Sequence, residues 1–236
     1  MTDRLDKWLC DRTSFSRKEV RQRIRSGSVT VNGTIVKTAD VRVGQSDAVT
    51  LDRQTIAADR HVYIMLNKPK GVVSVSNAPD DRTVIDLLPD SLRRSGLFPA
   101  GRLDRDTTGF VLITDDGDFA HRILSPRRHV SKTYIVTLRD AAQDDYDAAF
   151  REGIVLGDGT KCLSAELERT DNPHRVIVHL HEGRYHQVKR MFAYLGNHVT
   201  DLHRACIGGL PLDADLAEGC CRLLTEVEVR RIEQEV

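Results

Sequence analysis

The sequence contains no long apolar run, because no stretch approaches the roughly 18 consecutive apolar residues that a membrane-spanning helix requires. Its opening segment, MTDRLDKWLC, carries charges at the place where a secretory signal peptide needs an apolar centre. These absences argue against a membrane protein and against export. We therefore expect a cytoplasmic protein without a membrane partner.

Cysteine is also scarce. The five cysteines are odd in number and scattered, and the adjacent Cys220 and Cys221 lack the two-residue gap of a zinc knuckle. No internal repeat or low-complexity segment is apparent. The thiols are therefore expected to be reduced and mostly structural.

Net charge is absent as well, because 35 lysine and arginine residues balance 35 acidic residues. A neutral chain argues against a nucleic-acid partner, but the charges are unevenly distributed. Residues 1–60 hold twelve basic and eight acidic side chains, and residues 121–139 contain no acid. Such segregation can steer a polyanion to one face, although basic runs are often only solvated helix faces. The second basic block contains Arg122, Arg127, Arg128, Lys132 and Arg139.

The residues that are present indicate two modules, since 236 residues with 40% hydrophobic side chains suffice for two domains that each bury a core. Two short helices are predicted near the N-terminus. The first follows from apolar residues at helical spacing in RLDKWLCDR. The second lies in SRKEVRQRIRSG, where Ser16 is a suitable N-cap and Gly27 ends the helix.

A hairpin is predicted next, because SVTVNGTIV alternates around Asn32 and Gly33, a strong signal for a two-residue turn. Residues 54–60 are predicted to form a linker, and a strand-rich region begins with HVYIMLNKPKGVVSV. The first module thus consists of two helices plus a hairpin.

The N-terminal segments RLDKWL and SRKEVRQRIRSGSVTVNG resemble the S4 RNA-binding module of ribosomal protein S4 and of many RNA-modifying enzymes. The resemblance implies that the second helix and the hairpin present cations to structured RNA. The matching side chains are Arg17, Lys18, Arg21 and Arg25. By itself this module implies RNA binding and no reaction.

Residues 101–119, GRLDRDTTGFVLITDDGDF, are crowded with aspartates. Asp104, Asp106, Thr108, Gly109 and Asp115 match positions of an EF-hand calcium loop. However, the segment after Gly109 has a β-branched and aromatic strand pattern, and the last ligand position lacks the usual Glu. We therefore expect no metal here.

The same stretch is instead predicted to be a turn that leads into a buried strand, FVLIT, and reverses at DDGD. Asp104 precedes the strand and lies between Arg102 and Arg105, cations that would keep its carboxylate ionised. The remaining aspartates are expected to be ordinary turn residues. These are Asp115, Asp116 and Asp118.

The rest of the chain closely resembles the pseudouridine synthases of the bacterial family that modifies small-subunit ribosomal RNA. The resemblance rests on four ordered motifs, LNKPKGVV, GRLDRDTTGFVLITDDGDFAHRI, SPRRHVSKTYIVTL and EGRYHQVKRMFAYLGNHVTDLHRACIGGLPL. It implies an α+β fold, with residues 1–59 as the S4 module and residues 60–236 as the catalytic domain. That domain should be a mixed, mainly antiparallel sheet flanked by a few helices, with the active cleft across its middle.

The resemblance also implies a reaction: the bond between uracil N1 and ribose C1′ breaks, the base turns, and C5 is joined to C1′. This isomerisation requires no cofactor. Asp104 is the carboxylate that the family's RLD motif makes catalytic. Attack on C1′, addition to the uracil ring and removal of a sugar proton stay open, because a carboxylate serves each route.

Three substrate-binding residues follow from the same resemblance. Arg102 would fill the gap left by the flipped base, and Tyr134 would stack on the target uracil. Lys189 would pair with Asp104 and hold its carboxylate ionised and oriented.

Other residues are weaker candidates. Arg127 and Arg128 are expected to bind RNA as part of the second basic block. Lys68 or Lys70 could contact phosphate. Phosphate contact and packing are the roles expected for Arg184, His186, Gln187 and Arg190, without assignment of either to a single residue. The histidines His186, His198 and His203 lack metal spacing and a chemical role.

The expected partner is 16S ribosomal RNA in a small-subunit assembly intermediate, modified by a monomer, with uridine 516 as the target by resemblance. An alternative is an inactive S4-type RNA-binding or ribosome-assembly factor, which loss of Asp104, Tyr134 or Lys189 would have favoured. A glycosidase with paired carboxylates is disfavoured, because no second candidate acid is evident.

Overall fold

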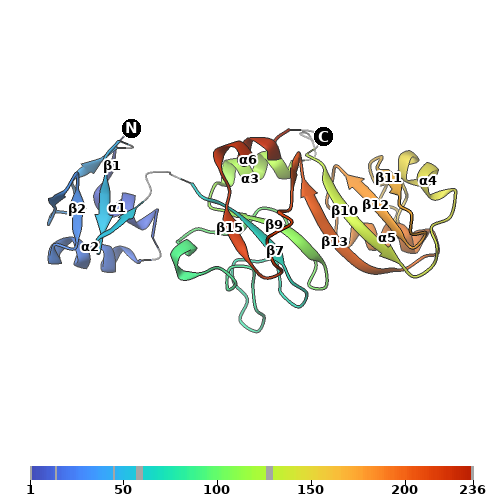
Figure 1. The fold of residues 1–236 in the computed structure, drawn as a ribbon, viewed down its shortest axis with the longest axis horizontal. Coiled ribbons are helices and arrows are strands. Elements are labelled where there is room, and N and C mark those ends of the chain that lie inside the picture. The colour runs from blue at the N-terminus through green and yellow to red at the C-terminus, as the bar shows by residue number, and fades with distance from the viewer. Residues whose placement is uncertain (1, 14, 45, 57–60, 126–129, 235–236) are drawn as a thin grey trace. The chain divides into compact units, whose positions relative to one another are not determined.

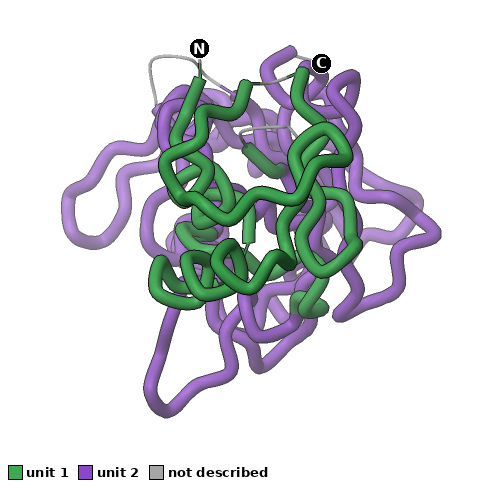
Figure 2. The backbone as a smooth tube through the Cα atoms, turned by 90° about the vertical axis from the view of Figure 1, so that its left-hand side faces the viewer, with its two compact units in different colours: residues 1–62, 88–98 green, residues 63–87, 99–236 purple. Residues whose placement is uncertain are grey.

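The computed structural model describes residues 2–13, 15–44, 46–56, 61–125 and 130–234. The chain forms two compact units, shown in different colours in Figure 2. The first comprises Met1–Val62 and Leu88–Phe98, and the second comprises Tyr63–Leu87 and Pro99–Val236. Each unit has its own sheet and core.

The two predicted helices of the first unit are confirmed as α1 (Leu5–Cys10) and α2 (Arg17–Ser26). Helix α2 begins at a capping box in which Ser16 and Glu19 bond each other's backbone. It ends at Gly27, whose φ of 82° is the left-handed conformation that glycine adopts readily. Both boundaries were therefore readable from the sequence.

The sheet of the first unit has the strand order β3-β2-β5-β6, and a short pair, β1 with β4, lies against α1. Asn32 and Gly33 turn the β2–β3 hairpin with φ of 52° and 79°, which confirms the two-residue turn. The predicted linker is wrong at its start, because residues 54–56 pair with β5; residues 57–60 lie outside the described residues. The strands are β1 (Asp3–Arg4), β2 (Val29–Val31), β3 (Thr34–Ile35), β4 (Arg42–Val43), β5 (Val49–Leu51) and β6 (Gln54–Ile56).

The second unit is built on a sheet with the order β11-β12-β10-β13-β9-β7-β15, to which β14 and β8 add at β13 and β9 (Figure 1). The pairings along this path are antiparallel except that of β13 with β9, which is parallel, and β14 is antiparallel to β13. This confirms the predicted α+β fold with a mixed, mainly antiparallel sheet. The strands are β7 (Tyr63–Lys68), β8 (Phe98–Pro99), β9 (Thr108–Thr114), β10 (Lys132–Leu138), β11 (Glu166–Arg169), β12 (Arg175–Leu180), β13 (Val199–Ile207), β14 (Leu210–Pro211) and β15 (Cys221–Leu223).

The parallel pairing of β13 with β9 depends on a glycine. Gly109 lies opposite Arg204 with a φ of 102°, and a Cβ atom at this position would overlap the backbone carbonyl oxygen of Arg204. Another residue would push the two strands apart. Gly109 therefore has a packing role, which accounts for the residue that matched the EF-hand glycine.

Strand β9 is buried along nearly its whole length, as its apolar sequence predicted. The reversal predicted at DDGD is wrong, because Asp116 begins helix α3 (Gly117–Leu124) instead of closing a turn. The Asp116 carboxylate accepts hydrogen bonds from the Phe119 amide at 2.9 Å and from the Tyr63 hydroxyl at 2.6 Å. A short aspartate that bonds nearby backbone serves a helix N-cap as well as a turn, and the sequence did not distinguish the two.

Three further helices complete the second unit: α4 (Tyr146–Glu152), α5 (Gln187–Tyr194) and α6 (Glu226–Ile232); a 3-10 turn, Asp90–Leu92, belongs to the first unit. Helices α3 and α6 lie side by side (Figure 1), and Arg122 pairs with Glu233 at 2.9 Å at the end of α6. Rings of α4 pack on Phe192 of α5, which fixes α5 against the core. Within the described part of the chain, no helix is long and apolar enough to cross a membrane.

Candidate active site

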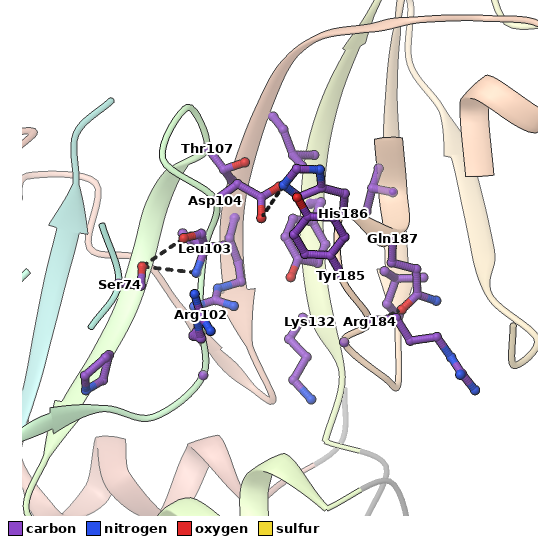
Figure 3. A pocket seen from close by; sticks show the side chains of 18 of the residues that line it. Ser74, Arg102, Leu103, Asp104, Thr107, Lys132, Arg184, Tyr185, His186 and Gln187 are labelled. Carbon is purple, nitrogen blue, oxygen red and sulfur yellow. Dashed lines mark hydrogen bonds and ion pairs between the residues drawn. The ribbon is translucent and has the colours of Figure 1, made fainter. Parts of the chain in front are cut away.

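A cavity of about 780 Å³ opens in the second unit where the loop before β9 faces strands β10 and β13 and the segment before α5 (Figure 3). This volume is in the range of small-molecule pockets, about 300–1,000 Å³. Asp104 is the acidic side chain among the described residues that line the cavity. The cavity therefore combines one carboxylate with the size needed for a nucleoside.

The loop that carries Asp104 is held from both sides. On one side, the Ser74 hydroxyl donates to the Leu103 carbonyl at 3.0 Å and accepts from the Leu103 amide at 3.1 Å. On the other, the buried Lys68 ammonium donates to backbone carbonyls of the loop, at 3.3 Å to Arg105 and 2.8 Å to Thr107. Asp104 thus projects from a backbone with little freedom to move.

Lys68 therefore has a structural role, and the prediction that it could contact phosphate is wrong. Its side chain is buried, and removal from water lowers its pKa to about 8. Lys70 pairs with Asp201 at 2.6 Å on the surface.

The basic side chains next to Asp104 come from the segment around the start of α5. The Lys189 ammonium lies 3.2 Å from Asp104 Oδ2, and His186 Nε2 lies 3.5 Å from Asp104 Oδ1. Arg105, which the sequence placed beside Asp104, instead pairs with Asp81 at 3.0 Å. The prediction that cations flank Asp104 therefore named the wrong side chains within the loop.

Lys189 is shared between two carboxylates, because its ammonium also donates to Asp106 Oδ1 at 2.6 Å. Burial alone would lower the pKa of Lys189, but the hydrogen bonds to Asp106 and Asp104 outweigh it and raise that pKa. The Lys189 hydrogen bond in turn lowers the pKa of Asp106. The cation beside Asp104 thus stays charged throughout the neutral range.

His186 was missed by sequence reasoning. It is the N-cap of α5 in a left-handed conformation, with φ of 49°, which turns its ring toward Asp104 (Figure 3). The Tyr185 ring stacks on it with centroids 3.8 Å apart. No sequence pattern predicts the contact of His186 with Asp104, because it depends on one backbone angle and on a residue far away in the chain.

Tyr134 and Arg102 occupy different depths of the cavity. Tyr134, on β10, is 8% exposed and lines the interior. Arg102 is exposed at the lining, and within the described ranges no acid pairs with it. The buried Tyr134 ring suits stacking on a base that enters the cavity. The exposed Arg102 cation suits contact with an RNA backbone that stays outside it.

Lys132 and Arg204 form a buried cationic wall that the sequence did not predict as part of the pocket. Lys132 donates to the Val130 carbonyl at 2.7 Å, and burial, followed by the charge of Arg204, lowers its pKa to about 8. Arg204 donates through Nε to the Phe110 carbonyl at 2.7 Å. These two side chains make part of the cavity lining positive.

Comparison with known proteins agrees with this geometry. The sequence pattern of the family described as RNA pseudouridylate synthase matches residues 62–194, and that of the S4 domain matches residues 3–49. The chain belongs to the RNA pseudouridylate synthase family. It is therefore an enzyme, an isomerase, with an N-terminal S4 domain.

Individual pseudouridylate synthases resemble the whole chain. Ribosomal small subunit pseudouridine synthase A of Escherichia coli (strain K12) is 44% identical over 230 residues, which cover 97% of this chain and 99% of that protein. The protein of the same name from Haemophilus influenzae is 43% identical over 231 residues, with the same coverage. A solved pseudouridylate synthase is 42% identical, with a TM-score of 0.68 over 97% of this chain and 99% of that one.

In this pseudouridylate synthase, the S4 cations lie exposed on α2, but they are not equivalent. Buried Asp6 accepts two hydrogen bonds from Arg21, at 3.1 and 2.9 Å, and lies 3.8 Å from Arg17. Lys18 and Arg25 have no ion-pair partner among the described residues. Lys18 and Arg25 therefore keep their full charge for a polyanion, whereas Arg21 also holds the module together.

The two other RNA-binding candidates cannot be located. Arg127 and Arg128 lie outside the described residues of this pseudouridylate synthase.

Proposed function

We propose that this chain converts uridine to pseudouridine in 16S ribosomal RNA, with Asp104 as the acting carboxylate. The observation that carries the proposal is the position of Asp104: held by a braced loop, paired with Lys189 at 3.2 Å, and facing a nucleoside-sized cavity. The names of the relatives from Escherichia coli and Haemophilus influenzae support the small-subunit substrate. By the same likeness we propose uridine 516 as the target.

The reaction balances without an oxidant or reductant. The N1–C1′ bond breaks, the base turns within the cavity, and a C5–C1′ bond forms, while C5 loses its proton and N1 gains one. An ionised carboxylate can act on C1′, on the ring or on a sugar proton. Lys189 keeps Asp104 oriented in each case.

Substrate access gives the other residues their proposed roles. A stacked uridine must be turned out of the RNA at a cost of a few kcal/mol. We propose that Tyr134 stacks on the uracil inside the cavity and that Arg102 fills the space it leaves. The S4 cations Lys18 and Arg25 hold the RNA through phosphate contacts, which position without specifying sequence.

The proposed setting is a monomer in the cytoplasm that acts on RNA in a small-subunit assembly intermediate. The alternative that the sequence left open, an inactive RNA-binding assembly factor, is disfavoured because the chain is a pseudouridylate synthase and keeps the pairing of Asp104 with Lys189.

The test is to map pseudouridine in ribosomal RNA from cells with the gene, without it, and with the gene restored as wild type or as Asp104→Asn. We expect one 16S site to lose its modification on deletion and to regain it only with wild type. An unchanged 16S map after deletion would refute the function. Restoration by Asp104→Asn would refute the role of Asp104 alone.

A further inference from the structure

Tyr185 presents an aromatic ring to solvent at the edge of the active-site cavity. Its side chain is the most exposed of the large hydrophobic residues described, at 77%, although it lines the cavity. The His186 ring covers one of its faces, with centroids 3.8 Å apart and planes 17° from parallel. The remaining face is left for a ligand.

Tyr185 and Tyr134 are not equally suited to stack on the same nucleobase. Tyr134 is 8% exposed and belongs to the cavity interior, where the uridine that reacts must lie. Tyr185 lies between Asp104 and Arg184 in Figure 3, with its ring against His186. An exposed ring in this position suits a base outside the reacting position.

The backbone that carries Tyr185 is fixed by buried hydrogen bonds. The Gln187 side chain accepts from the Arg184 amide at 2.9 Å and donates to Glu182 at 2.7 Å. Glu182 also accepts from the Leu163 amide at 2.9 Å. Because the segment is already ordered, stacking on Tyr185 costs little conformational entropy.

We propose that Tyr185 is a stacking platform for the nucleobase next to the uridine that enters the cavity. The proposal rests on the proposed function, because turning a uridine out of the RNA removes a stacking partner from its neighbours. The Tyr185 ring replaces that partner. Since every base has a flat face, the platform adds affinity with little dependence on the neighbour's identity.

The test uses a hairpin RNA containing the mapped 16S site, with either neighbour of the target uridine intact or replaced by an abasic residue. Binding constants are measured for wild type and for Tyr185→Ala, Tyr185→Trp and Tyr194→Ala. Tyr194 is the matched control, because it is also an exposed tyrosine, at 61%, but does not line the cavity.

We expect Tyr185→Ala to weaken binding of intact RNA by roughly five- to a hundredfold, the range typical of losing one stacked base. Tyr185→Trp and Tyr194→Ala should bind like wild type. For wild type, an abasic residue at one of the two neighbouring positions should weaken RNA binding as much as Tyr185→Ala does. The same abasic residue should cause no further loss of affinity in Tyr185→Ala, because the two changes remove the same contact.

Unchanged affinity of Tyr185→Ala, or additive losses at both abasic positions, would overturn the platform. So would a loss confined to the rate at saturating RNA, which would make Tyr185 a support for His186. Pseudouridine formation by wild type on the intact hairpin is measured in parallel. Its absence would count against the proposed function, whereas its presence with additive losses would count against the platform alone.

Discussion

The two aspartates that share Lys189 differ in what else they contact. The Asp104 side chain is 26% exposed and lines the cavity, whereas that of Asp106 is 71% exposed and does not. Asp106 nevertheless makes the shorter contact with Lys189, 2.6 Å against 3.2 Å. The shorter ion pair therefore does not identify the reacting carboxylate, and we propose Asp104 because its side chain, and not that of Asp106, lines the cavity.

We predict that Asp104→Asn lowers the single-turnover rate by roughly a thousandfold or more, because the amide keeps the size of the carboxylate but neither attacks nor accepts a proton. RNA affinity should change little, since Asp104 is not a phosphate contact. The rate can be followed as tritium released from C5-labelled uridine, the position that loses its proton in the reaction.

Asp106→Asn is the matched control, since it removes the other carboxylate from the same lysine. It should keep the rate within about tenfold of wild type. Equal losses in the two variants would mean that the shared Lys189 geometry, and not the Asp104 carboxylate, limits the reaction.

Among single residues, the sequence predicted those that belong to the family motifs. Asp104, Arg102, Tyr134 and Lys189 came from resemblance, and their roles stay predictions. The contact of His186 and the true partner of Arg105 could not be foreseen, because both depend on how distant loops meet.

Helix α6 shows how one cap sets a pH dependence. Glu228 accepts from the Thr225 amide at 2.8 Å and from Arg222 at 2.7 Å, and these bonds, with that of Arg222 the larger, lower its pKa to about 2. A carboxylate with a lowered pKa stabilises the fold above its unfolded pKa, 4.5, and loses that contribution as the pH falls toward about 2.

Glu228→Gln should therefore lower the free energy of unfolding by on the order of 2 kcal/mol at pH 7, since one pKa unit corresponds to about 1.4 kcal/mol. The difference from wild type should shrink as the pH falls from 4.5 toward about 2, in urea titrations followed by circular dichroism. Glu226→Gln, at an 86% exposed position on the same helix, should show almost no difference at any pH. A pH-independent loss in Glu228→Gln would mean that packing, and not charge, stabilises the cap.

The elements that could be predicted are those with local signals. Ser16 and Gly27 predicted the ends of α2, and Asn32 and Gly33 predicted the hairpin turn, because caps and tight turns are encoded by a few neighbouring residues. Residues 54–56 look like a polar linker, yet they form β6 because β5 offers a pairing edge. DDGD became a helix start because the Asp116 carboxylate caps the Phe119 amide, an aspartate role that the sequence does not distinguish from a turn.

For the whole molecule, the proposed division of labour assigns affinity to the S4 domain and chemistry to the catalytic unit. Substitution of Lys18 and Arg25 tests this division of labour better than substitution of Arg21 or Arg17, because those two side chains lie next to the buried Asp6 carboxylate. Removing Arg21 would leave that carboxylate short of a partner and cost stability as well as charge.

We predict that Lys18→Ala with Arg25→Ala weakens binding of looped RNA and flattens the slope of log affinity against log salt by up to about 1.4, or about 0.7 per cation. The single-turnover rate at saturating protein should stay near that of wild type. Tyr134→Ala should slow the rate without changing the salt slope, because stacking on the uracil releases no counterion.

An unchanged salt slope in the double variant would mean that these cations do not anchor the RNA. Basic residues of the catalytic unit would then have to supply the affinity.

The pairing of β9 with β13 joins the two halves of the catalytic sheet. It brings together Thr108 and His203, about 95 residues apart, whereas β10 with β12 and β7 with β9 close shorter connections; β15 is added to β7 from farther along the chain. Distant pairings are slower to form, because more chain must be ordered before they are made. The cavity draws its walls from both sides of this seam, so a newly made chain with both halves folded but unjoined has no place to receive a uridine. Catalytic competence therefore requires this long-range pairing, and an intermediate in which β9 and β13 are not yet joined should not modify RNA.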